Sequence, residues 1–212
     1  WREETPGKLV DMSIKSSFRS RGERSDYLRM LVSMIGACPL AGIAAVDEVA
    51  GRTASFREEE AKMLGLVEES SFFLDEDERG ELVILDLTRY RTQPRVQRNL
   101  AYIVHPDSLG VVSIGSVFKS GTKTNDLSLS ISLSMNLTGR EHGKDAGEIM
   151  RSLNIGDGHA GAAGGSIRCG SKEMMLREKE AVLREIWELW KRMPSAGPEN
   201  SVSYRNGADP GQ

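Results

Sequence analysis

The sequence predicts an α/β protein in which a mixed sheet flanked by helices is preceded by a mostly helical segment. Three observations support this fold class. Helix-like apolar spacing dominates residues 1–78, short runs of β-type residues follow Gly80, and one long amphipathic pattern ends at Met193. We therefore expect a helical connector over 1–78, a mixed domain over 79–193 and a flexible tail over 194–212.

Helix signals come first along the chain. Ser25 and Asp26 are candidate N-caps for a helix over 27–35. The Ala/Ile/Val-rich stretch 40–50 predicts a second, buried helix, and Ser55 is expected to cap a third, whose first turn is acidic. These signals make the first part of the chain helical.

The pattern changes after the acidic run 75–80, which predicts an exposed turn and marks the domain boundary. Residues 81–87 read as a buried strand, and 93–105 carry helix-like spacing. A second short strand is expected over 109–115. Strict alternation of apolar and polar residues over 127–134 predicts a half-buried strand.

The last part of the chain alternates helix, loop and helix. A short helix is expected over 146–153, followed by a glycine-rich loop over 156–165. Ser171 opens a long amphipathic helix. Its apolar stripe consists of Met175, Val182, Ile186, Leu189 and Met193.

The glycine-rich loop carries the chemical signal. Small residues this dense let the main chain approach a ligand closely, and successive N–H groups can form an anion-binding concavity. His159 adds a donor, and Arg168 adds a possible bidentate phosphate contact. The alternative is a tight structural turn. No G-K-[ST] follows, so this is not a P-loop, and a dinucleotide fingerprint is absent.

This loop resembles the G-G-G-H…A-A-G signature of the DHHA1 domain, the C-terminal domain of many DHH-family phosphoesterases. Gly158-His159 and Ala162-Ala163-Gly164 match it in order and spacing, while Asp157 replaces a glycine. The order of elements over 81–192 is also similar. The resemblance implies a DHHA1-like mixed sheet that holds a substrate phosphate. The candidate phosphate-binding residues are Gly156, Gly158, His159, Ala162, Ala163, Gly164 and Arg168.

Two departures from the family pattern limit the activity expected of this chain. The family's alternating strand often reads S-x-R, where this chain has Ser132-Leu133-Ser134, and the catalytic DHH triplet is absent. Asp75 and Asp77 form a D-x-D, but in an acidic run typical of a solvated turn. We expect no catalytic residue and no metal site here. The resemblance implies Mn²⁺ or Mg²⁺ in a catalytic DHH domain, on the same or a separate chain.

A second candidate contact is a group of arginines around Tyr90 and Pro94. Such a cluster beside an aromatic ring is typical of a nucleic-acid backbone contact, and the alternative is a solvated strand-to-helix connection. Its members are Arg89, Arg91, Arg95 and Arg98.

Two functional hypotheses follow from the resemblance. In the first, the chain is the substrate-binding part of a RecJ-like phosphodiesterase or exonuclease, a metal-dependent hydrolase, and is inactive alone. Its ligand is single-stranded nucleic acid, a short oligonucleotide or a small nucleotide such as a cyclic dinucleotide. Residues 1–78 are then a connector or a remnant of the DHH domain, and the start at Trp1 suggests a piece of a longer protein.

In the second hypothesis, the chain is a non-catalytic RecJ-related DNA-binding or scaffold subunit beside replication proteins. The DHHA1 domains of alanyl-tRNA synthetases carry a different version of the glycine motif, so we rank that relationship below both.

Composition narrows the setting. The net charge of −3 gives no overall attraction to nucleic acid. Cys38 and Cys169 are far apart in sequence and outside any C-x-x-C, so neither zinc nor a disulfide framework is expected, and the cytoplasm is the default compartment. No apolar run has the length of a membrane span.

Overall fold

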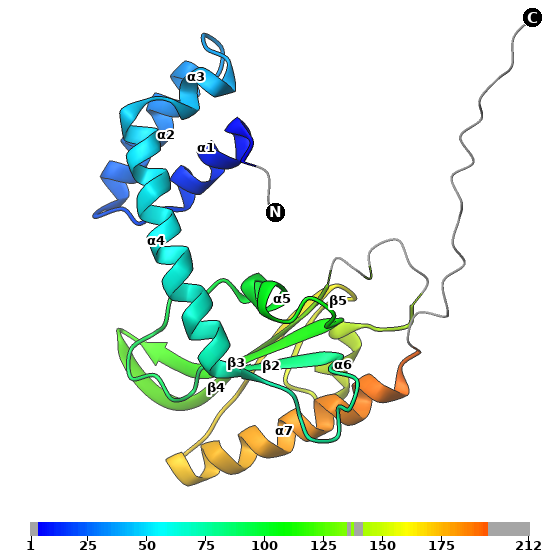
Figure 1. The fold of residues 1–212 in the computed structure, drawn as a ribbon. Coiled ribbons are helices and arrows are strands. Elements are labelled where there is room, and N and C mark those ends of the chain that lie inside the picture. Colours follow the sequence, from blue (N-terminus) through cyan, green and yellow to red (C-terminus); the bar gives the residue numbers. More distant parts are fainter. Residues whose placement is uncertain (1–3, 135–136, 138–141, 195–212) are drawn as a thin grey trace, which may run out of the picture. The chain divides into compact units, whose positions relative to one another are not determined.

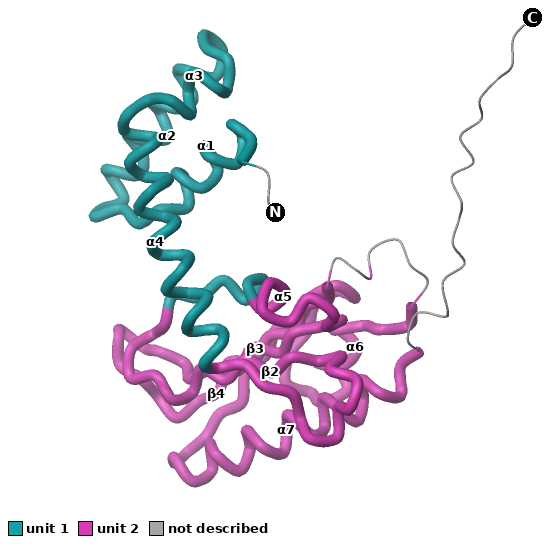
Figure 2. Tube along the Cα trace, viewed as in Figure 1, with its two compact units in different colours: residues 1–69, 95–100 teal, residues 70–94, 101–212 magenta. Residues whose placement is uncertain are grey.

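A computed structural model describes residues 4–134, 137 and 142–194. The chain divides into two compact units (Figure 2). Unit 1 comprises residues 1–69 and 95–100, and unit 2 comprises residues 70–94 and 101–212. The division falls earlier than the acidic run chosen from the sequence, and no sequence signal predicted that 95–100 returns to unit 1. Apart from Pro194, the predicted tail lies outside the described residues.

Unit 1 is helical. Its core is formed where Val10, Tyr27, Leu31, Ile43 and Val49 meet. The elements are α1 (Pro6–Lys15), α2 (Arg21–Met34), α3 (Leu40–Ala44), α4 (Asp47–Ser70, of which Ser70 belongs to unit 2) and the 3₁₀ helix η1 (Arg98–Leu100). The helical character predicted for the first part of the chain is confirmed.

Three helix boundaries predicted in unit 1 are wrong. The second helix is capped by Ser20, whose side chain accepts a hydrogen bond from the Glu23 amide, rather than by Ser25 or Asp26. The stretch 40–50 is divided between α3 and α4. Ser55 lies inside α4, a 24-residue helix. Local capping signals failed because Ser and Asp are also tolerated within helices.

Unit 2 is built on a six-stranded mixed sheet with the order β1-β2-β3-β4-β6-β5 (Figure 1). Strands β2 and β3 are parallel, and the other neighbours are antiparallel. The strands are β1 (Ser71–Phe72), β2 (Leu82–Asp86), β3 (Gly110–Lys119), β4 (Thr122–Leu133), β5 (Gly156–His159) and β6 (Ala162–Ile167). The helices are α5 (Ala101–Val104), α6 (Ala146–Ser152) and α7 (Lys172–Arg192).

The main core of unit 2 lies between the sheet and the helices α6 and α7. Leu127, Leu129 and Ile131 of β4 contribute to it, together with Ile186 and Trp190 of α7. The whole predicted apolar stripe of the last helix packs into or against this core, so that prediction is confirmed. The short helix α5 lies on the opposite side of the sheet from α7 (Figure 1).

A buried lysine completes the C-terminal end of α7. The Lys144 ammonium donates to the main-chain oxygens of Trp190 (2.8 Å) and Met193 (3.1 Å) and lies 3.7 Å from the Glu81 carboxylate. Burial lowers the pKa of Lys144, against the opposing effect of Glu81. This lysine satisfies helix-end carbonyls that would otherwise be buried without a donor.

Two predicted segments of unit 2 differ from the structure. Residues 93–105 do not form one helix, because only η1 and α5 are helical and the segment before them is irregular. The glycine-rich segment 156–165 is not a loop but most of a β-hairpin. Glycine lowers strand propensity, which hid both strands from sequence reasoning.

Candidate phosphate-binding face

The glycine-rich segment forms the hairpin of β5 and β6, with a two-residue turn at Ala160-Gly161. Strand β5 is the edge of the sheet. A loop of freely pointing amides is therefore the wrong description, since the inner strand β6 is paired on both sides. Any phosphate contact must come from side chains on one face of the hairpin or from the free edge of β5.

Most of the glycines in the hairpin are required by close packing. A Cβ atom on Gly156 or Gly158 would lie well under 3 Å from backbone atoms of the same hairpin, and one on Gly165 would lie 2.5 Å from the carbonyl oxygen of Ile155, just before β5. A Cβ on Gly147 of α6 would lie 2.6 Å from the carbonyl oxygen of Gly158. Helix α6 therefore rests directly on the backbone of β5. At these positions the structural explanation of the glycine motif is sufficient.

Gly164 is different. A Cβ atom there would meet its nearest neighbour, the Leu129 oxygen, at 3.5 Å, which is an ordinary contact. The residue is exposed and its φ is not in the left-handed region. Neither packing nor backbone conformation demands glycine at position 164. A glycine here leaves the backbone uncovered on the outer face, which would let a ligand approach it closely.

The outer face of the hairpin and of β4 carries small polar side chains in register. Ser130 pairs with Gly164, which pairs with Asp157, and the next row is Ser132, Ala162 and His159. Alternate residues on the same strands point into the core. We call this surface the serine–glycine face. It consists of Ser128, Ser130, Ser132, Asp157, His159, Gly164 and Ser166.

Several hydroxyls on this face are uncommitted. The side-chain hydroxyls of Ser128, Ser130 and Ser166 have no hydrogen-bond partner among the described residues, and each is at least partly exposed. The Ser132 hydroxyl is buried and also unpartnered there. Tyr102 of α5 donates to the Ser132 carbonyl oxygen at 2.7 Å and so lies over this row. Because the Ser132 hydroxyl is closed to solvent, the hydroxyls open to a ligand on this face are those of Ser128, Ser130 and Ser166.

His159 lies at the corner of the serine–glycine face and is exposed. Its Nδ1 accepts a hydrogen bond from the Gly161 amide at 3.1 Å. Because Nδ1 is the acceptor in this contact, the ring proton lies on Nε2. The Nε2–H group is therefore a donor that no described residue uses, held in place by the turn of the hairpin.

Asp157, where the family signature has a glycine, is held by two donors. One carboxylate oxygen accepts from the Gly158 amide at 2.7 Å and from Arg151 at 2.9 Å. These contacts, the amide first, lower the pKa of Asp157. Arg151, in the last turn of α6, thus places a guanidinium beside the edge strand. Sequence reasoning missed it, and its only signal was a basic residue just before the motif.

The remaining predicted hairpin residues are spread out. Ala163 points into the core, and Ala162 is half-buried in the row of His159. Arg168 is exposed at the other end of β6. Six residues of strand separate it from Ala162, or about 20 Å. A single phosphate bound at His159 therefore cannot reach Arg168.

The predicted arginine cluster is divided between the units. Arg89 and Arg91 belong to unit 2, while Arg95 and Arg98 belong to unit 1. Arg89 lies against the Tyr90 ring, with 5.0 Å between its guanidinium carbon and the ring centroid, and donates to the Tyr90 hydroxyl at 2.8 Å. Arg95 is paired with Glu59 at 2.7 Å. These two arginines have structural partners, and the four do not form one patch within either unit.

The described residues do not fit a catalytic metal centre. No group of three or more His, Cys, Asp or Glu side chains among them is arranged to hold an ion. Asp77 was expected in a solvated turn but is buried. Its carboxylate accepts hydrogen bonds from the amides of Glu81 and Leu82. His105 bonds to Ser71, and burial lowers its pKa. Both cysteines are free thiols. We derive no metal-dependent step from this chain.

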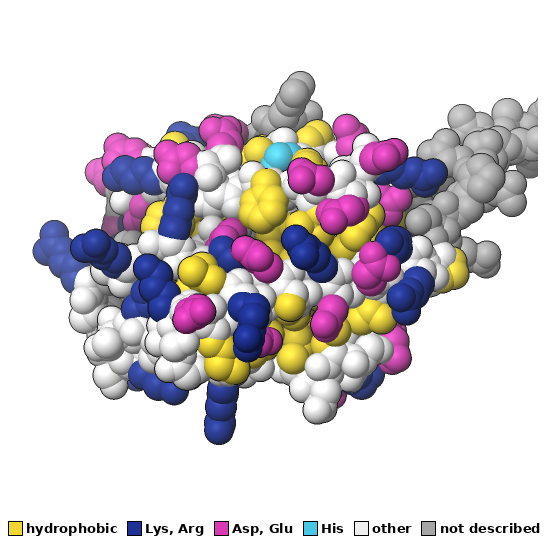
Figure 3. All heavy atoms as spheres, turned by 90° about the horizontal axis from the view of Figure 1, so that it is seen from below, with side chains coloured by type: hydrophobic (Ala, Val, Ile, Leu, Met, Phe, Trp, Pro, Cys, Tyr) yellow, Lys and Arg dark blue, Asp and Glu magenta, His cyan; other side chains and the backbone are white. Residues whose placement is uncertain are grey.

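The side of the molecule on which α7 lies does not look like a phosphate-binding surface. Seen from below in Figure 3, basic and acidic side chains are interspersed with hydrophobic ones, and no large area of one sign is visible. Mixed charges give little net attraction for an anion.

Within the described residues, no helix is both long and apolar enough to span a membrane.

Sheet order, flanking helices and hairpin motif together define unit 2 as a DHHA1-like α/β domain. No protein-family model and no curated protein sequence matches the chain. Solved structures do. A pGpG-specific phosphodiesterase from Vibrio cholerae aligns with a TM-score of 0.63 and 18% identity, over 88% of this chain and 62% of that one.

A second similar structure is the DHH domain of a member of the s1p family of ribosomal proteins. It aligns with a TM-score of 0.50 and 14% identity, over 90% of this chain and 42% of that one. The chain thus spans less than two thirds of either structure. At these identities the comparisons show the fold, which is that of DHH-family proteins with a DHHA1-like domain and a helical segment before it.

Proposed function

We propose that unit 2 binds a phosphate of a short oligonucleotide for a DHH-family phosphodiesterase whose metal ions, Mn²⁺ or Mg²⁺, are held by a catalytic domain outside this chain. The observation that carries the proposal is the serine–glycine face. It combines the free Nε2–H donor of His159, the unpartnered hydroxyls of Ser128, Ser130 and Ser166, and the bare backbone of Gly164. Hydrogen-bond donors beside an open backbone suit a phosphodiester oxygen.

The size of the face favours a short ligand. Three strands span about 10 Å from centre to centre, which accommodates one or two nucleotides rather than a long track. The similar Vibrio cholerae protein is described as specific for pGpG, a linear dinucleotide. We therefore propose short 5′-phosphorylated oligonucleotides as the ligand in preference to long single strands. RecJ-like exonuclease action on long DNA is the less favoured alternative. Free thiols on Cys38 and Cys169 are consistent with a cytoplasmic setting.

The proposal is tested by binding of pGpG to the intact chain, measured by calorimetry at two salt concentrations. His159→Ala removes the Nε2–H donor and should weaken binding by about 1–3 kcal/mol. His142→Ala is the matched control. That histidine is partly buried in the turn before α6, where its Nδ1 accepts from the Lys144 amide, and it lies outside the face. Equal binding by both variants and wild type would remove His159 from the site, and no binding by any form would sink the proposal.

A further inference from the structure

Unit 1 contains a basic cavity that the proposed function does not use. It has a volume of about 470 Å³ and lies beside the N-terminal end of α2. Four cationic side chains line it, and no carboxylate is among its lining residues. The cations are Lys15, Arg21, Arg24 and Arg95. Lys15 and Arg95 are paired with Asp11 and Glu59, which lie outside the lining, so the uncompensated positive charge comes from Arg21 and Arg24. A cavity of this size and sign suits an anionic small molecule.

Arg21 and Arg24 of α2 lie at positions where their positive charges destabilise the helix. Arg21 and Arg24 are three residues apart, so they lie on one side of the helix, and both occupy its first turns. The helix dipole is positive at this end, and like charges at this spacing repel. Neither guanidinium forms an ion pair with a described residue. A bound anion would relieve both unfavourable effects.

The one acid in this turn is already committed. Glu23 accepts from the Arg19 amide at 2.6 Å and from Arg52 at 2.8 Å. The hydrogen bond from Arg52, followed by that from the Arg19 amide, lowers the pKa of Glu23, which therefore stays ionised but points its oxygens to other donors. The amides of Arg21 and Gly22, at the start of the helix, remain among those without an intrahelical acceptor.

Arg95 supplies a third, oriented guanidinium. It donates to the Glu59 carboxylate at 2.7 Å, to the Lys15 carbonyl oxygen at 2.6 Å and to the Ser17 hydroxyl. These contacts hold it at the wall of the cavity.

Ser20, also in the lining, accepts from the Glu23 amide and keeps its own O–H proton free to donate. Phe18 gives the cavity an aromatic side chain.

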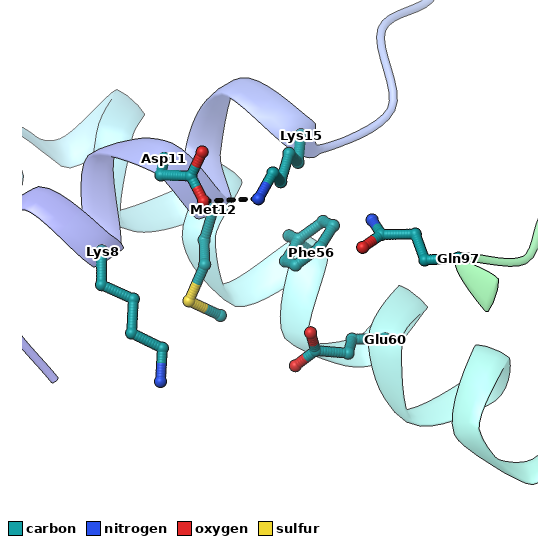
Figure 4. Close-up of a pocket in the computed structure, with 7 residues that line it drawn as sticks. All are labelled: Lys8, Asp11, Met12, Lys15, Phe56, Glu60 and Gln97. Carbon is teal, nitrogen blue, oxygen red and sulfur yellow. Dashed lines mark hydrogen bonds and ion pairs between the residues drawn. The ribbon is translucent and has the colours of Figure 1, made fainter. Parts of the chain in front are cut away.

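A neighbouring cavity in the same unit shows what a mixed lining looks like. It measures about 290 Å³, and both carboxylates and amines line it (Figure 4). There the Lys15 ammonium is neutralised by Asp11 at 2.6 Å, and Glu60 adds a second negative charge. Lys8 balances the charge of Glu60, so this lining carries no net charge and gives an anion no net attraction. Of the two, only the cavity at α2 has the charge for a phosphate.

We propose that the cavity at the start of α2 binds a phosphoryl group, either of a nucleotide or of inorganic phosphate. Arg21 and Arg24 contact its oxygens, and the first amides of α2 donate to it. The site consists of residues of unit 1 alone, so it stands or fails independently of the serine–glycine face.

The test is a titration of the ¹⁵N-labelled intact chain with guanosine 5′-monophosphate, inorganic phosphate and guanosine, followed by amide NMR shifts. Both phosphoryl compounds should shift the Arg21 and Gly22 amides, and guanosine should not. The double variant Arg21→Gln, Arg24→Gln should weaken the affinity at these amides at least tenfold. Arg29→Gln is the matched control, because Arg29 is exposed on the same helix outside the cavity.

The ratio of the affinities for guanosine 5′-monophosphate and for inorganic phosphate shows whether the phosphoryl group comes from a nucleotide. Tighter binding of the nucleotide assigns the site to nucleotides, and equal binding assigns it to the phosphoryl group alone. If the double variant loses helical circular dichroism, Arg24→Gln alone is used and should still weaken binding. The proposal is overturned if the two amides do not shift, if guanosine shifts them equally, or if Arg29→Gln weakens binding as much as the double variant does.

Discussion

The two faces of the β4–β6–β5 region use alternating residues of the same strands for different purposes. On the inner face Leu129 and Ala163 belong to the core that includes α6 and α7, and Gly165 lies close to the Ile155 backbone. On the outer face Ser130 and Gly164 leave a polar, uncovered surface. One glycine-rich motif therefore encodes two features. Some of its glycines let backbones touch, and another keeps a surface flat and open.

The largest effect is expected from adding a methyl group on the inner face. Gly165→Ala would bring a Cβ atom to about 2.5 Å from the Ile155 carbonyl oxygen. Because the obstacle is backbone, relief requires strand movement, and we expect unit 2 to lose about 1–3 kcal/mol of unfolding free energy. Urea denaturation, followed through the fluorescence of Trp187 and Trp190, measures this.

Gly170→Ala is the matched control for that experiment, because nothing lies within 4 Å of the added Cβ. Its unfolding midpoint should match that of the wild type or exceed it slightly. An equal loss in both variants would mean that glycine is needed for reasons other than packing against β5.

A smaller, different effect is expected on the outer face. Gly164→Val adds a branched side chain where a Cβ has room, and valine favours strands. The unfolding midpoint should be unchanged or raised, while pGpG affinity should fall at least tenfold because the surface is no longer flat. Calorimetry on the folded variant decides the matter, and undiminished affinity would show that the ligand does not approach Gly164.

The smallest effect concerns the charge at Asp157. Asp157→Asn removes a negative charge two residues from His159 and frees Arg151 from its ion pair. Anion binding should strengthen by about a few-fold, and the gain should shrink at high salt. Unchanged or weaker binding would indicate that the carboxylate itself contacts the ligand.

The same aspartate has a pH signature. Its folded pKa is lowered, so its contribution to stability is present above the ordinary Asp pKa and is lost as the pH falls through the folded value. Acid unfolding curves of wild type and Asp157→Asn should therefore converge only at acidic pH. Curves that differ mainly above neutrality would contradict this assignment.

The sequence predicted the fold of unit 2 better than that of unit 1. Period-2 alternation in β4 and the apolar stripe of α7 are strong patterns, and both were confirmed. In unit 1, Ser25 and Ser55 carried cap signals that longer helices overrode. Capping depends on where the whole helix packs, which a short sequence window does not contain.

The candidate site was only partly visible in the sequence. His159 and Gly164 could be named from the motif, but the hairpin geometry could not, since glycine disguises strands. The serines of β4 join the face only through the register of β4 with β6, which pairs them with residues 30 to 38 positions away in the chain. Arg151 enters only because α6 packs on β5. These are tertiary relationships, which local patterns do not report.

The most direct test of the central claim is an amide NMR titration of the intact chain with pGpG, read across both faces of the sheet. Shift changes should concentrate at Ser128–Ser132 and at Asp157–Gly164, with the amides of α7 hardly affected. Changes centred on α7 or α6, with the hairpin unmoved, would contradict it, and the glycine motif would then be a packing feature alone.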